Sequence, residues 1–337
     1  RTSPVIIEFG GVVFVPIRIV FAPSPLTFSV AVPDAFVFAM SRRTSTKPRL
    51  ARFPATHAAR SLSSTGLQTF TANDLQGMEF PPLDYFVDDL ITEGLTLLAG
   101  KPKMGKSWMA LDLAMSIASG HDALGGRATQ QGTTLYCALE DNQRRLQRRM
   151  RHNYGDQDSW PSNFHFTTQL NKVDEGGLEQ LENWIVEHQP SLIIIDTLVC
   201  IRPKSRSENG YDADYAALSP LQKLAGDYGI AILVIHHLRK MKGDDPLDMV
   251  SGTTGLTASV DNVLVLSRRS HGISLYGRGR EMEDIDIALS LDDGVWQILG
   301  ETDAVKISSE RKAIIELLQN TDKAMGPKDI AEALDQP

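Results

Sequence analysis

The 337-residue sequence has little cysteine, and it lacks any apolar run long enough to cross a bilayer. Only Cys137 and Cys200 occur, and they do not have the spacing of a metal site. Both lie in or beside apolar runs, so we expect reduced core thiols in a cytoplasmic protein. A membrane-spanning helix needs roughly 18 to 20 consecutive apolar residues. We therefore expect no membrane partner.

The sequence also lacks an excess of positive charge, since 34 basic residues face 42 acidic ones and the net charge is −8. This balance excludes a strongly cationic nucleic-acid-binding protein but allows a local basic patch. Residues 1–65 are the exception, with eight basic and two acidic residues. We expect this Pro-, Arg- and Ser-rich stretch to be a disordered or non-native extension, with a transit-type targeting segment as the alternative.

The rest of the chain alternates short β-branched runs with helical patterns. Such alternation is typical of an α/β fold in which helices cover both faces of a parallel sheet. Strands are predicted at 95–100, 133–140, 191–198 and 230–238, and helices at 106–119, 141–154, 178–189 and 215–229. Closely spaced strand patterns between 260 and 299 predict an antiparallel C-terminal extension of this sheet.

These patterns divide the sequence into an ATPase-sized α/β domain at 66–303 and a helical tail at 304–337. In the tail, a capped amphipathic helix is predicted at 308–320, and a second helix with Pro327 in its first turn at 326–334. The tail is either the beginning of a winged-helix unit or a simple pair of helices.

The segment GKPKMGKS at 100–107 matches the phosphate-binding pattern G-x-x-x-x-G-K-S/T. Glycines allow the backbone N–H groups to turn towards phosphate oxygens, and the helix that follows adds its positive end. Lys106 would reach the β- and γ-phosphates of ATP, and Ser107 would bind Mg²⁺. The alternative is a plain glycine turn, but the preceding strand and following helix favour a nucleotide site. Its predicted residues are Gly100, Lys101, Pro102, Lys103, Met104, Gly105, Lys106, Ser107 and Trp108.

Two carboxylates are predicted to complete this site. Asp196 ends the apolar strand LIIID, which would bring it to the P-loop edge of the sheet, where it could hold Mg²⁺ through water. Glu140 ends the strand at 133–140, which we expect to lie next to the P-loop strand, and could polarise the attacking water. The alternative for Glu140 is a surface or N-cap acid, although Asp141 suits the cap better.

His236 and His237 end the apolar strand at 230–238. A side chain at this position could sense the γ-phosphate and move the loop that follows. Metal binding is disfavoured because no third ligand has a suitable spacing. A structural core role remains the alternative for one of the two histidines.

The segments GKPKMGKS, YCALED, IIIDTL, VIHHLRK and SGTTGLTASVDNVLVL together resemble the RecA-like hexameric ATPases. The similarity is greatest to RepA-type plasmid helicases and related phage AAA-family ATPases, and it extends over about 70–300. It implies a RecA-like P-loop fold, ATP and Mg²⁺ as cofactors, and a ring in which ATP lies between adjacent subunits.

The resemblance also implies that a neighbouring subunit supplies a cationic finger to each site. Arg278 and Arg280 match the Lys/Arg pair that follows the penultimate strands in replicative helicases. The RepA-type pattern instead places an arginine just after the Asp-Asn pair, where this chain has Val263 and Leu264. Arg268 and Arg269 are the reserve candidates, and exposed arginines in a turn are the alternative for each position.

Three cationic segments could contact single-stranded DNA. The loop at 239–252 has Arg239, Lys240 and Lys242, but three nearby aspartates almost cancel them and it has no aromatic residue for base stacking. The predicted helix at 141–154 contains five arginines, some of them on one face, for which a solvated surface or a subunit contact is the alternative. Arg202, Lys204 and Arg206 form the third segment.

These features predict a Mg²⁺-dependent ATPase that forms a homo-oligomeric ring, most simply a hexamer. Its expected partners are single-stranded DNA and replication proteins. One alternative is a regulatory or loader ATPase that acts on a protein partner without translocating along DNA, which the acidic composition favours. The other is a module that binds nucleotide without cleaving it.

Overall fold

The computed structural model describes residues 69–80, 83–156, 159–203, 210–238, 250, 255–269, 272–321 and 325–334. The predicted extension at 1–65 lies outside these residues. In chain order the elements are α1 (Ala72–Gln76), β1 (Tyr85–Val87), β2 (Ile91–Thr92), β3 (Gly94–Gly100), α2 (Lys106–Ser119), β4 (Thr134–Ala138), α3 (Gln143–Tyr154), β5 (Phe164–Thr167), the short 3₁₀ helix η3 (Val173–Glu175), α4 (Gly177–His188), β6 (Leu192–Asp196), α5 (Leu198–Ile201), α6 (Gly210–Tyr228), β7 (Ala231–His237), α8 (Gly255–Ala258), β8 (Asn262–Arg269), β9 (Gly272–Gly279), β10 (Ile285–Asp292), β11 (Val295–Glu301), α9 (Thr302–Gln319) and α10 (Pro327–Ala333).

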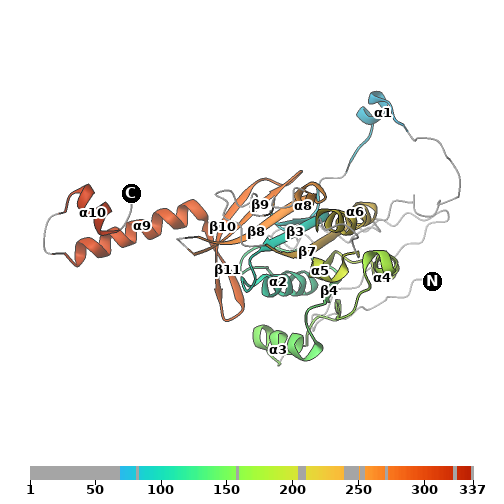
Figure 1. The fold of residues 1–337 in the computed structure, drawn as a ribbon, viewed down its shortest axis with the longest axis horizontal. Helices are drawn as coiled ribbons and strands as arrows, with labels where there is room; N and C mark the ends of the chain where they lie inside the picture. The colour runs from blue at the N-terminus through green and yellow to red at the C-terminus, as the bar shows by residue number, and fades with distance from the viewer. Residues whose placement is uncertain are drawn as a thin grey trace, which may run out of the picture. The chain divides into compact units, whose positions relative to one another are not determined.

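The main sheet has nine strands in the order β11-β10-β9-β8-β3-β7-β6-β4-β5 (Figure 1). The strands from β8 to β5 in this order run parallel. The strands β8 to β11 form an antiparallel meander on the other side. The predicted fold class is therefore confirmed: a RecA-like α/β P-loop fold with a mostly parallel sheet and an antiparallel C-terminal extension.

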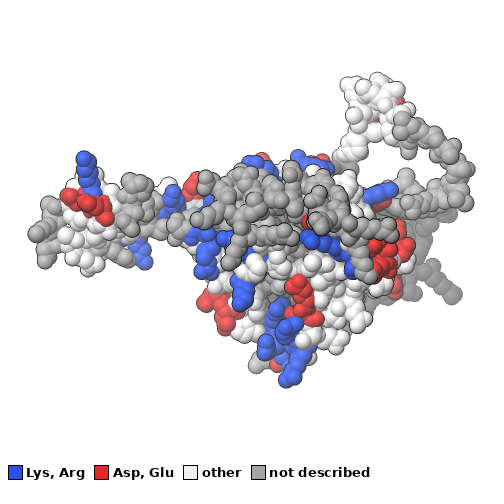
Figure 2. Space-filling model, viewed as in Figure 1, with Lys and Arg blue, Asp and Glu red and all other residues white. Residues whose placement is uncertain are grey.

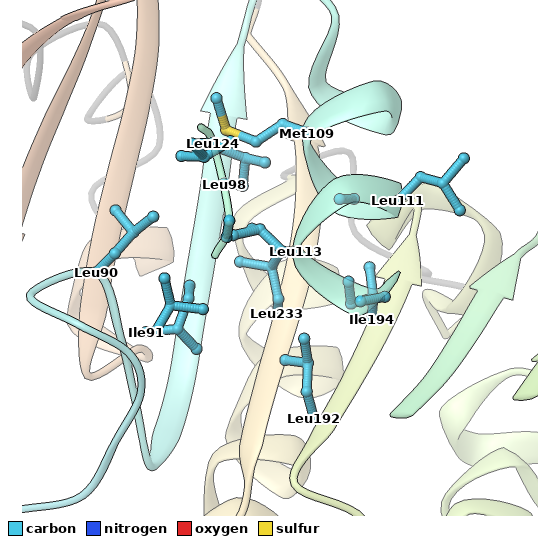
Figure 3. Packing of buried hydrophobic residues seen from close by; sticks show 14 of the residues in the cluster. Leu90, Ile91, Leu98, Met109, Leu111, Leu113, Leu124, Leu192, Ile194 and Leu233 are labelled. Carbon is cyan, nitrogen blue, oxygen red and sulfur yellow. The ribbon is translucent and has the colours of Figure 1, made fainter. Parts of the chain in front are cut away.

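The central parallel strands are buried on both faces, which explains their continuous apolar sequences. Successive residues alternate between two cores, because side chains along a strand point to opposite faces. Ile194 belongs to the core beneath α2 and α3, whereas Ile193 and Ile195 belong to the core beneath α4, α5 and α6. Figure 3 shows Leu98 and Leu233 from the strands packing against Met109 and Leu113 of α2.

The strand that leads to Glu140 does not lie next to the P-loop strand, so this part of the prediction was wrong. β4 pairs with β5 and β6, and β7 and β6 separate it from β3. After α2 the chain crosses two sheet positions that β6 and β7 occupy later. An apolar pattern shows that a strand is buried, but it does not specify the strand's neighbours.

Three local predictions also need correction. The cap of α3 is Asn142, whose side chain accepts a hydrogen bond from the Arg145 N–H, rather than Asp141. The tail helix α9 begins at Thr302 and not at Ser308, because it continues directly from β11. Cys137 is buried in β4 as expected, but Cys200 is only partly buried. The apolar run after Asp196 forms the short helix α5 rather than continuing as a strand, which leaves one side of it exposed.

In the part of the chain that the structure describes, no helix has the length and apolar character required to span a membrane.

Candidate active site

The P-loop connects the end of β3 to the beginning of α2, as predicted. Gly105 immediately precedes α2 with φ of +89°, a left-handed conformation that favours glycine. A Cβ on Gly105 would also lie 2.6 Å from Leu291 Cδ2 and 2.7 Å from Trp296 Cζ2. Backbone geometry and packing against the antiparallel hairpin therefore both require glycine here, and the loop is held against the start of α2.

Lys106 is buried at the base of this loop, where its ammonium group lies among carbonyl and carboxylate oxygens. Its Nζ donates hydrogen bonds to the carbonyl oxygens of Gly100 at 2.7 Å and Lys101 at 2.9 Å. Burial lowers the pKa of Lys106 to about 8, while the charges of Asp196 and Glu140 oppose this shift. The ammonium group thus lies in a poorly solvated position where an anionic phosphate would favour its charged form.

Asp196 lies at the end of β6 with its carboxylate next to the first turn of α2. Tyr136 donates a hydrogen bond to Asp196 Oδ2 at 2.8 Å, and Ser107 donates a second one to the same carboxylate. Burial raises the pKa of Asp196, and these two hydrogen bonds act in the opposite direction. A carboxylate and a hydroxyl in contact are oxygen ligands that suit Mg²⁺, and a cation would offset the cost of burying the carboxylate. The residues present therefore fit a magnesium ion held by Ser107 and, through water, by Asp196.

Glu140 reaches the same edge of the sheet from the loop after β4. Thr197 Oγ1 donates to Glu140 Oε1 at 2.9 Å, and His237 Nε2 lies 3.7 Å from Glu140 Oε2. His237 pairs in register with Gly100 of the P-loop strand, and both His236 and His237 are only partly buried. Glu140 is thus near the P-loop although two strands separate β4 from β3, because the carboxyl ends of all these parallel strands share one edge.

A family model described as an AAA domain matches residues 62–243 of this sequence. This chain belongs to the AAA domain family. The matched segment contains the P-loop, Glu140, Asp196 and the histidine pair. No curated protein matches the sequence.

Three solved structures resemble the AAA domain at low sequence identity. An ATPase domain has 14% identity and a TM-score of 0.48, with 61% of this chain and 85% of that chain covered. A DnaB-like replicative helicase, solved for its interactions with primase, has 13% identity and a TM-score of 0.47, with coverages of 60% and 57%. A KaiC-like protein from Pyrococcus horikoshii has 14% identity and a TM-score of 0.45, with coverages of 63% and 93%. These scores are too low for us to base any functional argument on them.

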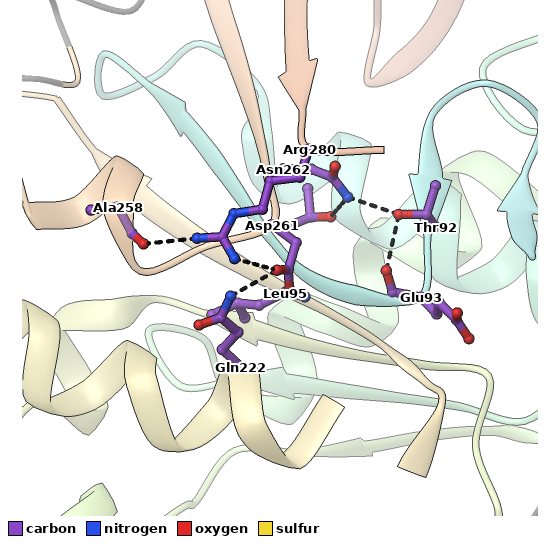
Figure 4. Close-up of polar contacts among 9 residues, drawn as sticks. Thr92, Glu93, Leu95, Gln222, Ala258, Asp261, Asn262 and Arg280 are labelled. Atoms are coloured by element: carbon purple, nitrogen blue, oxygen red, sulfur yellow. Dashed lines mark hydrogen bonds and ion pairs between the residues drawn. The ribbon is translucent and has the colours of Figure 1, made fainter. Parts of the chain in front are cut away.

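The two finger candidates of the AAA domain lie at the sheet edge opposite its own P-loop. β9 runs antiparallel to β8, and its last residues pair with Asn262 and Val263, near the beginning of β3 rather than its end. Arg278 forms an ion pair with Asp284 at 2.6 Å. Arg280 contacts Asp261, which also accepts hydrogen bonds from Gln222 and the Leu95 N–H (Figure 4). Arg278 and Arg280 both line a cavity of about 270 Å³ at this edge.

The reserve candidates lie at the P-loop edge instead. Leu266 pairs with Gly100, so Arg268 and Arg269 follow it at the carboxyl end of β8. Arg269 forms an ion pair with Asp286 at 3.0 Å. The predicted DNA-binding loop at 239–252 lies outside the described residues apart from Val250, as do Lys204 and Arg206 of the third cationic segment. Arg202 of that segment is described and forms an ion pair with Asp214.

The five arginines predicted to lie on one helix do lie on α3 or within it. Figure 2 shows a group of basic side chains at the bottom of the view, over α3. Two of them bind the chain's own acids, since Arg145 and Arg149 both form ion pairs with Asp141. Part of this basic surface is therefore used within the subunit.

Sequence reasoning missed two residues that contact the catalytic carboxylates, Tyr136 and Thr197. Tyr136 is fully buried in β4, two strand positions before Ala138, which pairs with Asp196. Thr197 follows Asp196 directly. A polar residue within a buried strand, or next to an acid at its end, was the available signal, because buried hydroxyls need hydrogen-bond partners.

Proposed function

We propose that this AAA domain is a Mg²⁺-dependent ATPase that works as a homo-oligomeric ring, most simply a hexamer, coupled to single-stranded DNA in replication. The convergence of Lys106, Asp196 and Glu140 at one sheet edge is the observation that carries the hydrolytic part of the proposal. No other arrangement among the described residues combines a phosphate-binding loop with two acids.

In the proposed reaction, water attacks the γ-phosphorus of ATP, and the bond to the ADP oxygen breaks. Glu140 orients the water and accepts its proton, while Thr197 and His237 hold or flank the carboxylate. The Lys106 ammonium group neutralises charge on the transferred phosphoryl group. When bound beside Ser107 and Asp196, Mg²⁺ would supply further neutralisation of phosphate charge.

The position of Arg278 and Arg280 supports the ring. Because they lie at the edge opposite the P-loop, they cannot complete the site of their own chain, but a neighbour stacked head to tail could present them to it. Repeated head-to-tail contacts of this kind close into rings when the rotation between subunits allows it. The arginines of α3 that do not bind Asp141 favour a nucleic-acid partner, since exposed cations neutralise phosphates.

The first test replaces Glu140 with glutamine, which keeps the shape of the side chain but removes the base. We expect ATP turnover to fall by about 10²-fold or more, with ATP binding retained. Unchanged turnover would exclude Glu140 as the residue that activates water.

The second part of the test measures ATPase rate against protein concentration, with and without single-stranded DNA. A specific rate that rises with concentration indicates sites shared between subunits, and stimulation by DNA indicates coupling. If DNA leaves the rate unchanged and strand displacement is absent, the helicase proposal fails. A regulatory or loader ATPase acting on a protein partner is then favoured.

A further inference from the structure

One arginine of α3 lies between the two catalytic segments. Arg149 Nη1 forms an ion pair with Asp141 Oδ2 at 2.9 Å, and the Asp141 side chain is only 8% exposed. On its other side, the Arg149 guanidinium carbon lies 5.4 Å from the centre of the Trp108 ring, a cation–π contact. The same side chain thus contacts an acid of the β4–α3 loop and an aromatic residue of α2.

Both contacted residues are sequence neighbours of groups in the candidate active site. Asp141 directly follows Glu140, the proposed base, and Trp108 directly follows Ser107, the proposed magnesium ligand. Because a single peptide unit links each pair, the position of Arg149 constrains the separation between Glu140 and Ser107. Arg149 is also among the charges that act on Asp196, opposing the upward effect of burial on the pKa of that carboxyl.

Neighbouring contacts hold both ends of this link in place. Arg145 donates hydrogen bonds to Asp141 Oδ1 at 2.5 Å and to the Glu140 carbonyl oxygen at 2.9 Å. One turn after Arg149, His152 Nε2 lies 2.6 Å from the Asp293 carbonyl oxygen in the β10–β11 turn. The His152 ring also meets Trp108 edge to face, with 6.0 Å between ring centres.

We propose that Arg149 is a positioning residue for ATP hydrolysis, which fixes the water-activating segment at Glu140–Asp141 relative to the magnesium-binding segment at Ser107–Trp108. This inference rests on the proposed ATPase function. It assigns the Trp108 ring to holding Arg149. A flat guanidinium suits this role because it pairs with a carboxylate at its edge and stacks on an aromatic ring with its face.

The test compares steady-state ATP hydrolysis by Arg149→Ala and Arg149→Lys, measured without DNA. If Arg149 positions the site, Arg149→Ala lowers kcat about tenfold or more, because small displacements of reacting groups are costly, and leaves KM within about twofold. Arg149→Lys keeps the charge but loses the planar group, so it should restore little of the activity. A Trp108→Phe variant keeps a ring for Arg149 to stack on and should retain most of the wild-type kcat.

Two controls separate this role from a general loss of stability. Gln147→Ala changes an exposed residue of the same helix, and Arg311→Ala removes an exposed positive charge on α9. Both should leave kcat and KM unchanged. Thermal unfolding of every variant is followed by circular dichroism. If Arg149→Ala changes only the unfolding temperature, or if Arg149→Lys restores full activity, the positioning role is wrong.

Glu140→Gln, measured in parallel, distinguishes the two proposals. If Glu140→Gln loses turnover while Arg149→Ala keeps it, only the positioning role fails. If Glu140→Gln keeps full turnover, the proposed hydrolytic site itself is wrong. Because Asp141 and Arg149 act as one link, an Asp141→Asn and Arg149→Ala double variant should lose no more activity than the more impaired single variant. Additive losses would overturn the link.

Discussion

The parallel and antiparallel halves of the sheet contribute to the candidate site in different ways. In the parallel half, β3, β4, β6 and β7 all end at one edge, so Gly100, Glu140, Asp196 and His237 meet there although they are far apart in sequence. In the antiparallel half, direction alternates from strand to strand. The end of β9 therefore carries Arg278 and Arg280 to the opposite edge.

The antiparallel half nevertheless returns to the P-loop through the β10–β11 hairpin. Trp296 packs against Gly105 and donates a hydrogen bond from Nε1 to the Gly105 carbonyl oxygen at 3.3 Å. A Cβ on Gly294 would lie 2.9 Å from the Trp108 ring. The comparison indicates that the parallel half holds the reactive groups. The antiparallel half supports the loop that binds phosphate and presents the finger candidates away from it.

The largest effect that this comparison predicts concerns its two edges. Lys106→Ala removes the phosphate-binding charge from one edge, and a combined Arg278→Ala and Arg280→Ala variant removes both cations from the other. Each protein alone should lose turnover by about 10²-fold or more, since each lacks a group that stabilises the transition state.

Mixing the two inactive proteins tests whether the edges of different subunits meet. In random rings from equal amounts, about a quarter of the interfaces would combine an intact P-loop with intact arginines, so activity should reappear. Continued inactivity of mixtures that do assemble would mean that these arginines are not the finger, and would direct attention to Arg268 and Arg269.

A smaller effect is expected from the support that the hairpin gives to the loop. Trp296 is 1% exposed, so Trp296→Ala should reduce the free energy of unfolding by about 3–5 kcal/mol. Urea unfolding followed by circular dichroism measures this loss. Trp296→Phe keeps most of the apolar contact and should lose much less. If Trp296→Ala unfolds like the wild type, the hairpin does not support the P-loop.

The smallest predicted effect is a fraction of a proton. The pKa of Lys106 is lowered to about 8 without nucleotide, and the anionic phosphates of bound ATP should raise it. Binding at pH 8 should therefore take up about half a proton, and the uptake should vanish well below pH 8, where the ammonium group is charged in both states. Calorimetry in two buffers of different ionisation enthalpy measures the uptake, and Lys106→Arg should abolish it. Proton release at pH 8 would contradict the lowered pKa.

Much of the fold could be predicted because local patterns report local structure. The phosphate-binding pattern placed the P-loop between β3 and α2 correctly, and the first and last residues of α2 agree with the prediction. The apolar run before Asp196 indicated a buried strand ending in an acid. The order of the strands could not be predicted in the same way. The expected contact between β4 and β3 was therefore wrong, although Glu140 still lies near the site.

The sequence by itself determined the chemical groups of this site, because the P-loop pattern and the acids at strand ends are contiguous features of a few residues each. Only the tertiary structure decided which of them meet. The contacts of Tyr136 with Asp196, Thr197 with Glu140, and Arg149 with Asp141 and Trp108 join separate elements. They depend on strand order and helix packing, which no local pattern encodes. For the same reason, only the folded sheet placed Arg278 and Arg280 on the edge away from their own P-loop.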